Sequence, residues 1–198
     1  MSALHALPES FFARDSLDVA HGLIGRWLRR DGVILRITEV EAYRLGDSAC
    51  HAWKGETPRN RPLFGPPGRV YMYLCYGVHR MLNVVTGEVG GPQGVLIRAA
   101  SPVEGAEVVF ARRGRSGPVS LTGPGKVSRA LDLDLSWSGH PVFEAGGLEI
   151  LQGEPAQARL VGPRVGIDYA LPEHRDAPWR VAEAGTPWVS VPRTLRPL

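Results

Sequence analysis

"RWLRRDGVILRITEVEAY", residues 26–43, contains two apolar runs on either side of Asp31-Gly32. Both residues of an Asp-Gly pair tolerate positive φ, so this dipeptide is a strong signal for a tight β-hairpin turn. The sequence therefore predicts paired strands over 26–30 and 33–41, and the second strand runs directly into two glutamates.

Those two glutamates, Glu39 and Glu41, share a parity with the apolar residues of their strand. If the strand stays regular, both side chains follow the apolar face to its far end. A carboxylate there is costly unless another group binds or uses it. We take both as candidates for chemistry; the structural alternative is that one of them pairs with an arginine such as Arg36 or Arg98.

The rest of the chain predicts a mixture of strands and short helices. Aromatic and β-branched residues surround Tyr76-Gly77, which indicates a second hairpin. Helical spacing follows Ser16, which is a possible N-cap, with Gly25 as the terminator. The expected elements are a hairpin over 70–85, a strand at 93–100, helices at 16–24 and 123–134, and an extended piece at 186–192.

Length and composition favour one domain spanning residues 1–198, of α+β class. The chain has 43% hydrophobic residues, enough for one substantial core. It shows neither a signal peptide nor a run of about 18 apolar residues, so we expect a soluble, intracellular protein without a membrane span. Two cysteines, Cys50 and Cys75, form neither a disulfide framework nor a metal-ligand motif, so no metal site is expected.

Positive charge is concentrated in the middle of the chain. Residues 51–130 hold eleven Lys and Arg against four acids, a net +7, whereas the whole chain is +3 and the remainder is therefore −4. This asymmetry gives modest support for a face that binds nucleic acid.

Aromatic and polar residues gather in the same region, namely Tyr43, His51, Tyr73, Tyr76 and Asn83. Each has an ordinary explanation in packing or backbone hydrogen bonding. Together, beside the arginine-rich loop "TPRNR" at 57–61, they are typical of a nucleobase pocket, because bases stack on aromatic rings and phosphates bind arginine. A tyrosine at a hairpin tip could also enter a base stack and fill the gap left by an extruded nucleotide.

Several blocks of sequence, in this order and spacing, resemble the alkyladenine (3-methyladenine/methylpurine) DNA glycosylase family, and two further blocks extend the match over nearly the whole chain. The blocks are "TEVEAYRLGDSACHAWKGETPRNRPLF" at 38–64, "GRVYMYLCYGVHRMLNVV" at 68–85, "GVLIRAASPVEG" at 94–105 and "GPGKVSRALDL" at 123–133, flanked by "FFARDSLDVAHGLIGRWL" at 11–28 and "GTPWVSV" at 185–191.

The resemblance implies a base-excision-repair enzyme with a curved antiparallel sheet, flanking helices and a protruding hairpin that probes DNA. Such an enzyme flips an alkylated or deaminated purine (3-methyladenine, 7-methylguanine, hypoxanthine or ethenoadenine) out of double-stranded DNA. It then hydrolyses the N-glycosidic bond without a cofactor, leaving an abasic site without strand cleavage. We expect a bare catalytic domain of bacterial type that is monomeric, cytoplasmic and nucleoid-associated.

The resemblance also implies residue roles. Glu41 matches the general base that activates water, and Arg98 matches the residue that helps to hold this water. Glu39 is secondary on this interpretation. The remaining assignments are Tyr43, His51 and Tyr73 as pocket walls, Asn83 as the residue that discourages attack on guanine, and Tyr76 as the intercalating residue. Independently of the resemblance, the positive charge of the middle segment leads us to expect contacts to the DNA backbone from Arg59, Arg61, Lys126 and Arg129.

Elementary chemistry is consistent with one ionised carboxylate as catalyst. A purine alkylated at N3 or N7 is cationic and is already a good leaving group, and aromatic rings favour stacking with it. For a neutral base such as hypoxanthine, protonated His51 or a backbone N–H would be the donor to look for. A lyase mechanism needs an amine, which only Lys54, Lys126 and the amino terminus supply, so hydrolysis is expected.

Two other classes of function remain open at this level. A non-catalytic DNA or RNA binding protein would use the same basic and aromatic surface. A glycosidase or nucleosidase acting on small substrates would use Glu39 and Glu41, because same-face neighbours on a strand lie about 7 Å apart, a separation compatible with sugar-bond hydrolysis.

Overall fold

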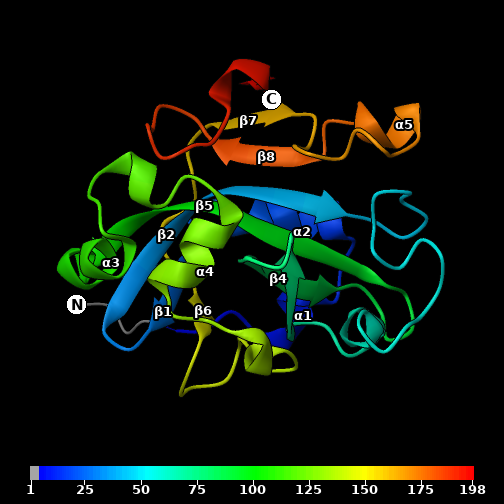
Figure 1. Cartoon of the computed structure of the whole chain (residues 1–198), viewed down its shortest axis with the longest axis horizontal. Coiled ribbons are helices and arrows are strands. Elements are labelled where there is room, and N and C mark those ends of the chain that lie inside the picture. Colours follow the sequence, from blue (N-terminus) through cyan, green and yellow to red (C-terminus); the bar gives the residue numbers. More distant parts are fainter. Residues whose placement is uncertain (1–4) are drawn as a thin grey trace.

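The computed structural model describes residues 5–198, and the first four residues of the predicted domain lie outside this range. An open antiparallel sheet has the strand order β3-β4-β5-β2-β8-β7-β9, and β1 joins β2 to β6 (Figure 1). Its strands are β1 (Trp27–Arg30), β2 (Val33–Tyr43), β3 (Val70–Cys75), β4 (His79–Thr86), β5 (Gln93–Glu104), β6 (Glu149–Leu151), β7 (Arg159–Gly162), β8 (Arg180–Glu183) and β9 (Arg196–Pro197). The α+β class predicted from the sequence is confirmed.

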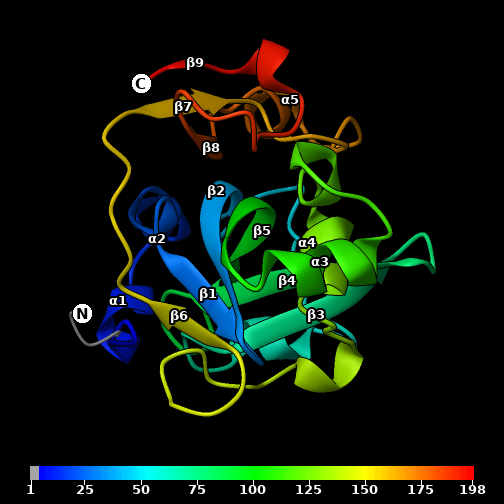
Figure 2. The same ribbon diagram turned by 90° about the vertical axis from the view of Figure 1, so that its left-hand side faces the viewer.

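The described residues contain five α-helices: α1 (Glu9–Phe12), α2 (Ser16–Leu23), α3 (Ala106–Arg113), α4 (Pro124–Ala130) and α5 (Pro172–Arg175). Helix α4 packs on β4 and β5, and α2 packs on β2 and β5 (Figures 1 and 2). Asp15, not Ser16, caps α2, because the Asp15 carboxylate accepts from the N–H of Leu17. The sequence did not predict α3 or the strands β6, β7 and β8.

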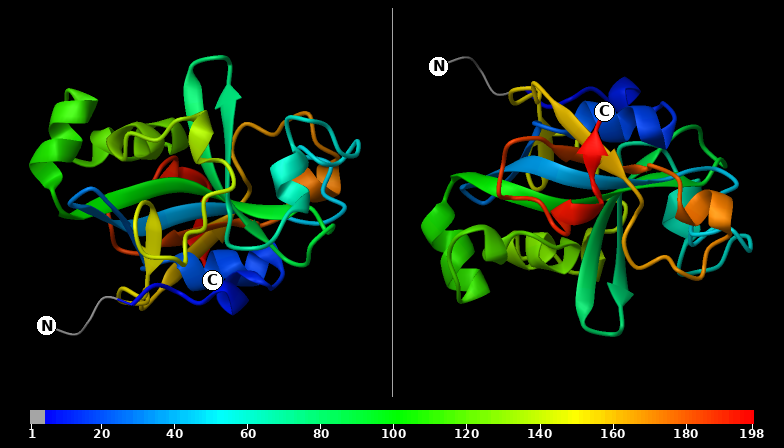
Figure 3. Two further views of the ribbon diagram at one scale, coloured as in Figure 1. Left: turned by 90° about the horizontal axis from the view of Figure 1, so that it is seen from below. Right: turned by 90° about the horizontal axis from the view of Figure 1, so that it is seen from above.

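Both predicted hairpins are present. Asp31 and Gly32 have φ of 46° and 74° and connect β1 to β2. Tyr76 and Gly77, with φ of 52° and 70°, lie in the turn between β3 and β4. This second hairpin projects from the body of the molecule (Figure 3).

Strand β2 is not regular, and this changes which face the glutamates occupy. Its pairing with β5 shifts register on both sides of Glu39, so that Thr38 and Arg98 have no partner in this ladder. The core residues of β2 accordingly change parity: they are Val33, Leu35 and Ile37 before the shift, and Val40 and Ala42 after it. The prediction that Glu39 and Glu41 extend the apolar face of a regular strand is therefore wrong, because both lie on the face opposite the core.

That opposite face of β2 is covered by the C-terminal part of the chain. Strands β8, β7 and β9 extend the sheet from the edge of β2, and Figure 2 shows them beside the C-terminus. The segment 186–192 is irregular instead of forming a strand. Its backbone binds side chains of β2: Trp188 O accepts from Thr38 Oγ1 at 2.5 Å, and the N–H of Ser190 donates to Glu39 Oε2 at 2.6 Å.

Candidate active site

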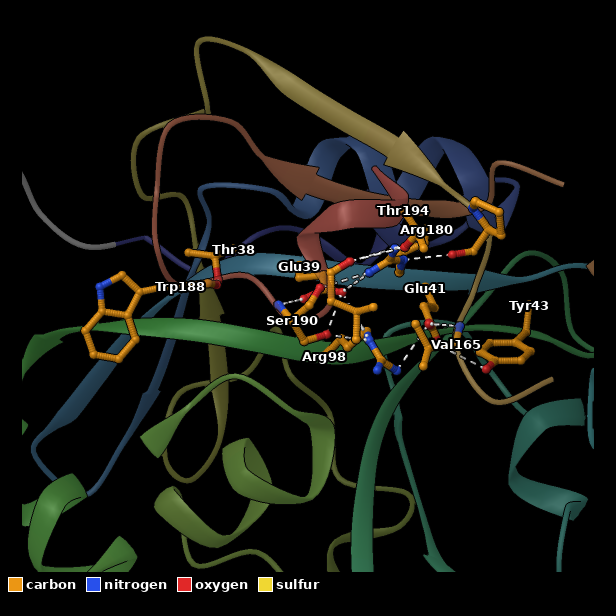
Figure 4. A network of polar contacts seen from close by, with 12 residues as sticks. Thr38, Glu39, Glu41, Tyr43, Arg98, Val165, Arg180, Trp188, Ser190 and Thr194 are labelled. Atoms are coloured by element: carbon orange, nitrogen blue, oxygen red, sulfur yellow. Dashed lines mark hydrogen bonds and ion pairs between the residues drawn. The ribbon is translucent and has the colours of Figure 1, made fainter. Parts of the chain in front are cut away.

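Glu41 is fully buried and both of its carboxylate oxygens have donors (Figure 4). Oε1 accepts from the N–H of Val165 at 2.8 Å and lies 3.2 Å from Arg98 Nη1. Oε2 accepts from the Tyr43 hydroxyl at 3.1 Å. These three contacts come from β2, from β5 and from the loop after β7, so the fold fixes the position and orientation of this carboxylate.

Arg98, on β5, connects the two glutamates. Its Nε donates to Ser190 Oγ at 3.0 Å and lies 3.1 Å from Glu39 Oε1, while its Nη1 faces Glu41. The side chain is almost completely buried. The structural alternative considered above is therefore realised twice, because Arg98 pairs with both glutamates.

A pocket walled by aromatic rings is connected to Glu41 through the Tyr43 hydroxyl, although neither Glu41 nor Arg98 is among the residues that line it. It contains all four residues that the sequence predicted for a base pocket, and Tyr43 links it to the buried carboxylate. Burial, followed by the charge of Glu41, raises the pKa of Tyr43 well above its ordinary value, so the phenol is a neutral donor at neutral pH. The lining residues are Tyr43, Ala49, Cys50, His51, Leu63, Tyr71, Tyr73, Asn83, Gly94 and Tyr169.

His51 makes two contacts in this pocket, with Tyr71 and with Tyr73. Its Nδ1 lies 2.9 Å from the Tyr71 hydroxyl, and its ring packs edge-on against Tyr73 with centroids 4.3 Å apart. Burial, followed by the positive charge of Arg59, lowers the pKa of His51. This disfavours protonated His51 as the donor to a neutral base.

Asn83 has a defined amide orientation. Its Nδ2 donates to Tyr71 O at 3.1 Å and to Met81 O at 3.3 Å. A flipped amide would place Oδ1 against two carbonyl oxygens, so Nδ2 faces the backbone and Oδ1 is left as an acceptor. Asn83 also lines the pocket.

Several residues of the site were not predicted from the sequence. Tyr71 shares its strand parity with Tyr73, and that pattern could have identified it. Tyr169 and Arg164 have no such local signal, because they belong to the loop after β7. Arg164 is buried: it pairs with Asp47 (Nη2 to Oδ1, 2.9 Å), and its guanidinium carbon lies 4.6 Å from the centroid of the Tyr43 ring.

A second, larger depression of about 1090 Å³ lies between the β3–β4 hairpin and α4. Lys126 and Arg129 line it, together with Arg80 and Arg113. Partial burial lowers the pKa of Lys126, and the nearby positive charge of Arg113 lowers it further. We call this depression, defined by Arg80, Arg113, Lys126 and Arg129, the basic groove.

The other predicted DNA contacts lie outside the basic groove. Arg59 donates to Leu74 O at 3.0 Å, and exposed Arg61 pairs with Glu56 at 2.9 Å. Tyr76 is 90% exposed at the hairpin tip and does not line the aromatic pocket. The structure thus gathers Glu41, Arg98, Tyr43, His51, Tyr73 and Asn83 in one place and leaves Tyr76, Arg59 and Arg61 on the surface around it.

The sequence model described as methylpurine-DNA glycosylase matches residues 10–187. The chain belongs to the methylpurine-DNA glycosylase family. It is therefore a monofunctional DNA glycosylase, which hydrolyses N-glycosidic bonds, and it acts in base excision repair.

Similar proteins occur in bacteria and in a plant. A protein of Arabidopsis thaliana named DNA-3-methyladenine glycosylase is 56% identical over 201 residues, which cover 100% of this chain and 79% of that protein. A protein of Nitrosococcus oceani, provisionally named a 3-methyladenine DNA glycosylase, is 59% identical over 193 residues, which cover 96% of each chain. Because one of these relatives is a plant protein, the similarity does not restrict the family to bacteria.

Across residues 5–198, no helix is both long and apolar enough to cross a membrane. Within the same residues, no group of three or more His, Cys, Asp or Glu side chains is arranged to hold a metal ion.

Proposed function

We propose that the protein hydrolyses the N-glycosidic bond of an alkylated or deaminated purine flipped out of duplex DNA, with water activated by Glu41. The observation that carries this proposal is a fully buried carboxylate whose oxygens are held by three donors, one of which, Tyr43, is also a wall of an aromatic pocket. The names of the relatives favour 3-methyladenine as a substrate.

The pocket suits a flat, cationic base. Tyr43, Tyr71 and Tyr73 supply aromatic faces, and stacking on such a face contributes about 1–3 kcal/mol per base. A purine alkylated at N3 carries positive charge, which interacts favourably with aromatic rings. Neutral His51 adds hydrogen-bonding capacity without repelling this charge.

In the proposed reaction, Glu41 takes a proton from water while the water oxygen attacks C1′ of the flipped nucleotide. The C1′–N bond breaks and its electron pair leaves with the base, so a cationic purine departs neutral and needs no protonation. Arg98, 3.2 Å from Glu41 Oε1, helps to hold the water and stabilises the charge of the carboxylate.

Specificity against normal guanine is assigned to Asn83. Its Nδ2 is engaged by two backbone carbonyls, so the side chain cannot easily move aside. We propose that Asn83 clashes with the exocyclic amine of guanine and so discourages attack on normal guanine.

We further propose that Tyr76 fills the gap left in the DNA stack, and that phosphates lie along the basic groove, with Arg59 and Arg61 contacting the backbone nearby. The exposure of Tyr76 supports this arrangement, as do the four Lys and Arg side chains of the groove, which outnumber its two acids, Asp132 and Asp134. The DNA complex is expected to form with a monomer.

The decisive experiment compares wild type, Glu41→Gln and Glu149→Gln on duplexes that each contain one damaged purine opposite its normal partner. Incubation in EDTA followed by alkaline cleavage reports base release. Glu41→Gln should bind the lesion duplex yet release base at least about 100-fold more slowly, within the range that general acid–base catalysis contributes. Glu149→Gln is the matched control, because Glu149 is also a buried carboxylate paired with an arginine (Arg29, 2.6 Å) but lies in β6.

Wild-type-like release by Glu41→Gln would remove Glu41 from the role of base. Free nucleosides assayed in parallel test the small-substrate alternative: turnover of nucleosides without turnover of duplexes would contradict the proposal. A binding protein without activity would release base from none of these substrates.

A further inference from the structure

Glu39 is as completely buried as Glu41 and is bound by more donors. It accepts from the N–H of Ser190 at 2.6 Å, from Ser190 Oγ at 2.9 Å and from Arg180 Nη1 at 2.9 Å, and it lies 3.1 Å from Arg98 Nε. The last of these contacts matters for the site, because Arg98 is also the partner of Glu41 (Figure 4).

The contacts of Arg98 divide between the two edges of its guanidinium. The Nε edge is held by Glu39 and Ser190, and Nη1 is directed at Glu41. A guanidinium is planar, so fixing the Nε edge also fixes the direction of the terminal nitrogens. The position of Arg98 relative to Glu41 is thus set by Glu39 and Ser190.

Arg180 holds Glu39 from the other side. This fully buried arginine donates to Glu39, to Pro163 O at 2.8 Å and to Ser190 O at 3.0 Å, and also to Thr194. Glu39 is therefore fixed by β8 and by the segment 186–194 before any ligand binds.

The formal charges of this cluster balance when both carboxylates are ionised. Burial raises the pKa of Glu39, and the charge of Arg98, the N–H of Ser190 and the guanidinium of Arg180 oppose this rise. Two carboxylates, Glu39 and Glu41, are buried with two guanidiniums, those of Arg98 and Arg180. Loss of the Glu39 charge would leave Glu41 as the only nearby counter-charge for Arg98. A carboxylate under excess positive charge is a weaker base.

The other groups around Glu41 do not substitute for Glu39. The titratable and charged groups that face Glu41 are Arg98 from β5, Tyr43 from β2, Tyr73 from β3 and Arg164 from the loop after β7. Arg164 has its own counter-charge in Asp47, and the two tyrosines are neutral at neutral pH because burial raises the pKa of each.

We propose that Glu39 is a positioning residue: its carboxylate fixes the orientation of Arg98 and offsets the positive charge beside Glu41, so that Glu41 remains basic enough to activate water. This inference rests on the proposed role of Glu41 as base. It gives the second glutamate of the "TEVEAY" segment a role in the reaction without contact to the substrate.

The test is a pH profile of single-turnover base release by Glu39→Gln, from pH 5 to 9. The probe is duplex DNA methylated with dimethyl sulfate, and the readout is release of 3-methyladenine above the uncatalysed rate. The 3-methylated adenine stays cationic throughout this range while it is attached to the DNA, so its own protonation does not shape the profile. The acid limb should move to lower pH, because removal of the Glu39 charge leaves the positive charge of Arg98 beside Glu41 without its second counter-charge.

The plateau rate of Glu39→Gln should also fall at least about tenfold, because Arg98 loses its fixed orientation, while affinity for the methylated duplex stays within about twofold. Glu39→Asp keeps the charge, so its acid limb should coincide with that of wild type even if its plateau is lower. Glu149→Gln, which removes a buried carboxylate of β6 paired with Arg29, should change neither quantity.

A Glu39→Gln profile that matches wild type in both plateau and acid limb would overturn the inference. If Glu39→Gln does not fold, Ser190→Ala and Glu39→Asp test the inference in its place, because each variant disturbs the contacts that hold Arg98 but keeps the charges. Wild-type plateau rates in both variants would also overturn the inference. Failure of the proposed function gives a different result, because wild type would then release no base or Glu41→Gln would retain release.

Discussion

The hydroxyl of Tyr43 donates to Oε2 of Glu41 at 3.1 Å. A hydrogen bond thus connects one wall of the aromatic pocket to the carboxylate that we propose as the general base. A base stacked on Tyr43 would therefore lie beside the carboxylate that activates water. The same ring is backed by the buried guanidinium of Arg164, so its position does not depend on the substrate.

Replacement of Tyr43 by Phe should separate the two functions of this side chain. The ring remains for stacking, but Glu41 loses one of its three donors, and a hydrogen bond to a charged group contributes about 1.5–3 kcal/mol. We expect base release to fall at least about tenfold while affinity for a lesion duplex changes little. Single-turnover kinetics and titration of the same duplex measure both; a variant that loses affinity but keeps its rate would contradict this assignment.

His51 should make stability depend on pH. Burial lowers its pKa in the folded state, so the unfolded chain binds more protons once the pH falls below about 6.5. The stabilisation from neutral His51 is thus complete above that pH and is lost as the pH falls towards the folded pKa. His51→Gln should flatten the decline in the free energy of unfolding between about pH 6.5 and 5, measured by urea denaturation.

The control for this titration is His21, whose pKa burial also lowers but which lies in α2. His21→Gln should flatten the stability curve without altering binding of methylated DNA. If protonated His51 repels a cationic base, wild-type affinity should weaken at low pH, whereas that of His51→Gln should not; equal pH dependence of affinity in both proteins would rule this out.

Tyr76 should matter for DNA and not for the fold. Because the side chain is 90% exposed, Tyr76→Ser should change the free energy of unfolding by no more than about 0.5 kcal/mol. Loss of the proposed wedge should weaken lesion binding and flipping severalfold or more. Val78→Ser is the matched control, because Val78 lies in the same turn and is 73% exposed. Equal loss of lesion binding in the two variants would contradict a specific role for the Tyr76 ring.

The basic groove should contribute to binding through phosphate contacts. Lys126→Gln should reduce affinity about equally for damaged and undamaged duplexes. The magnitude of the slope of log association constant against log salt concentration should decrease by about one. Arg175→Gln removes a cation on α5 that is paired with exposed Asp176, and its salt slope should match wild type. A normal slope for Lys126→Gln would place the phosphates elsewhere.

Local sequence determined the two hairpins. Asp31-Gly32 supplies two positive φ values, and the strands on either side are short, apolar and adjacent in the chain. The turn after Cys75 follows the same logic, with Gly77 at positive φ. Elements with distant partners or long connections were harder to predict. Strand β8 pairs with β2, which lies far away in sequence, and β7 pairs with β8 across a loop that has no comparable turn signal.

The residue types of the site could also be identified from the sequence. Glu41, Tyr43, His51, Tyr73 and Asn83 were all predicted, and the fold brings all of them to the pocket or to its buried carboxylate. Tyr71 could have been added from strand parity. Tyr169 could not, because a loop contributes to a pocket only after the chain has folded around it.

The sequence by itself determined that two carboxylates, several aromatic rings and an arginine-rich middle segment occur in one chain, because composition and turn chemistry are local properties. Only the tertiary structure decided how the two glutamates differ. The register shift around Glu39 turns both of them away from the core, and side chains and backbone from β8 and the segment 186–194 then bind Glu39, while Val165 and Tyr43 hold Glu41. A pairing irregularity and contacts across more than 100 residues depend on how the whole sheet packs, which no local pattern specifies.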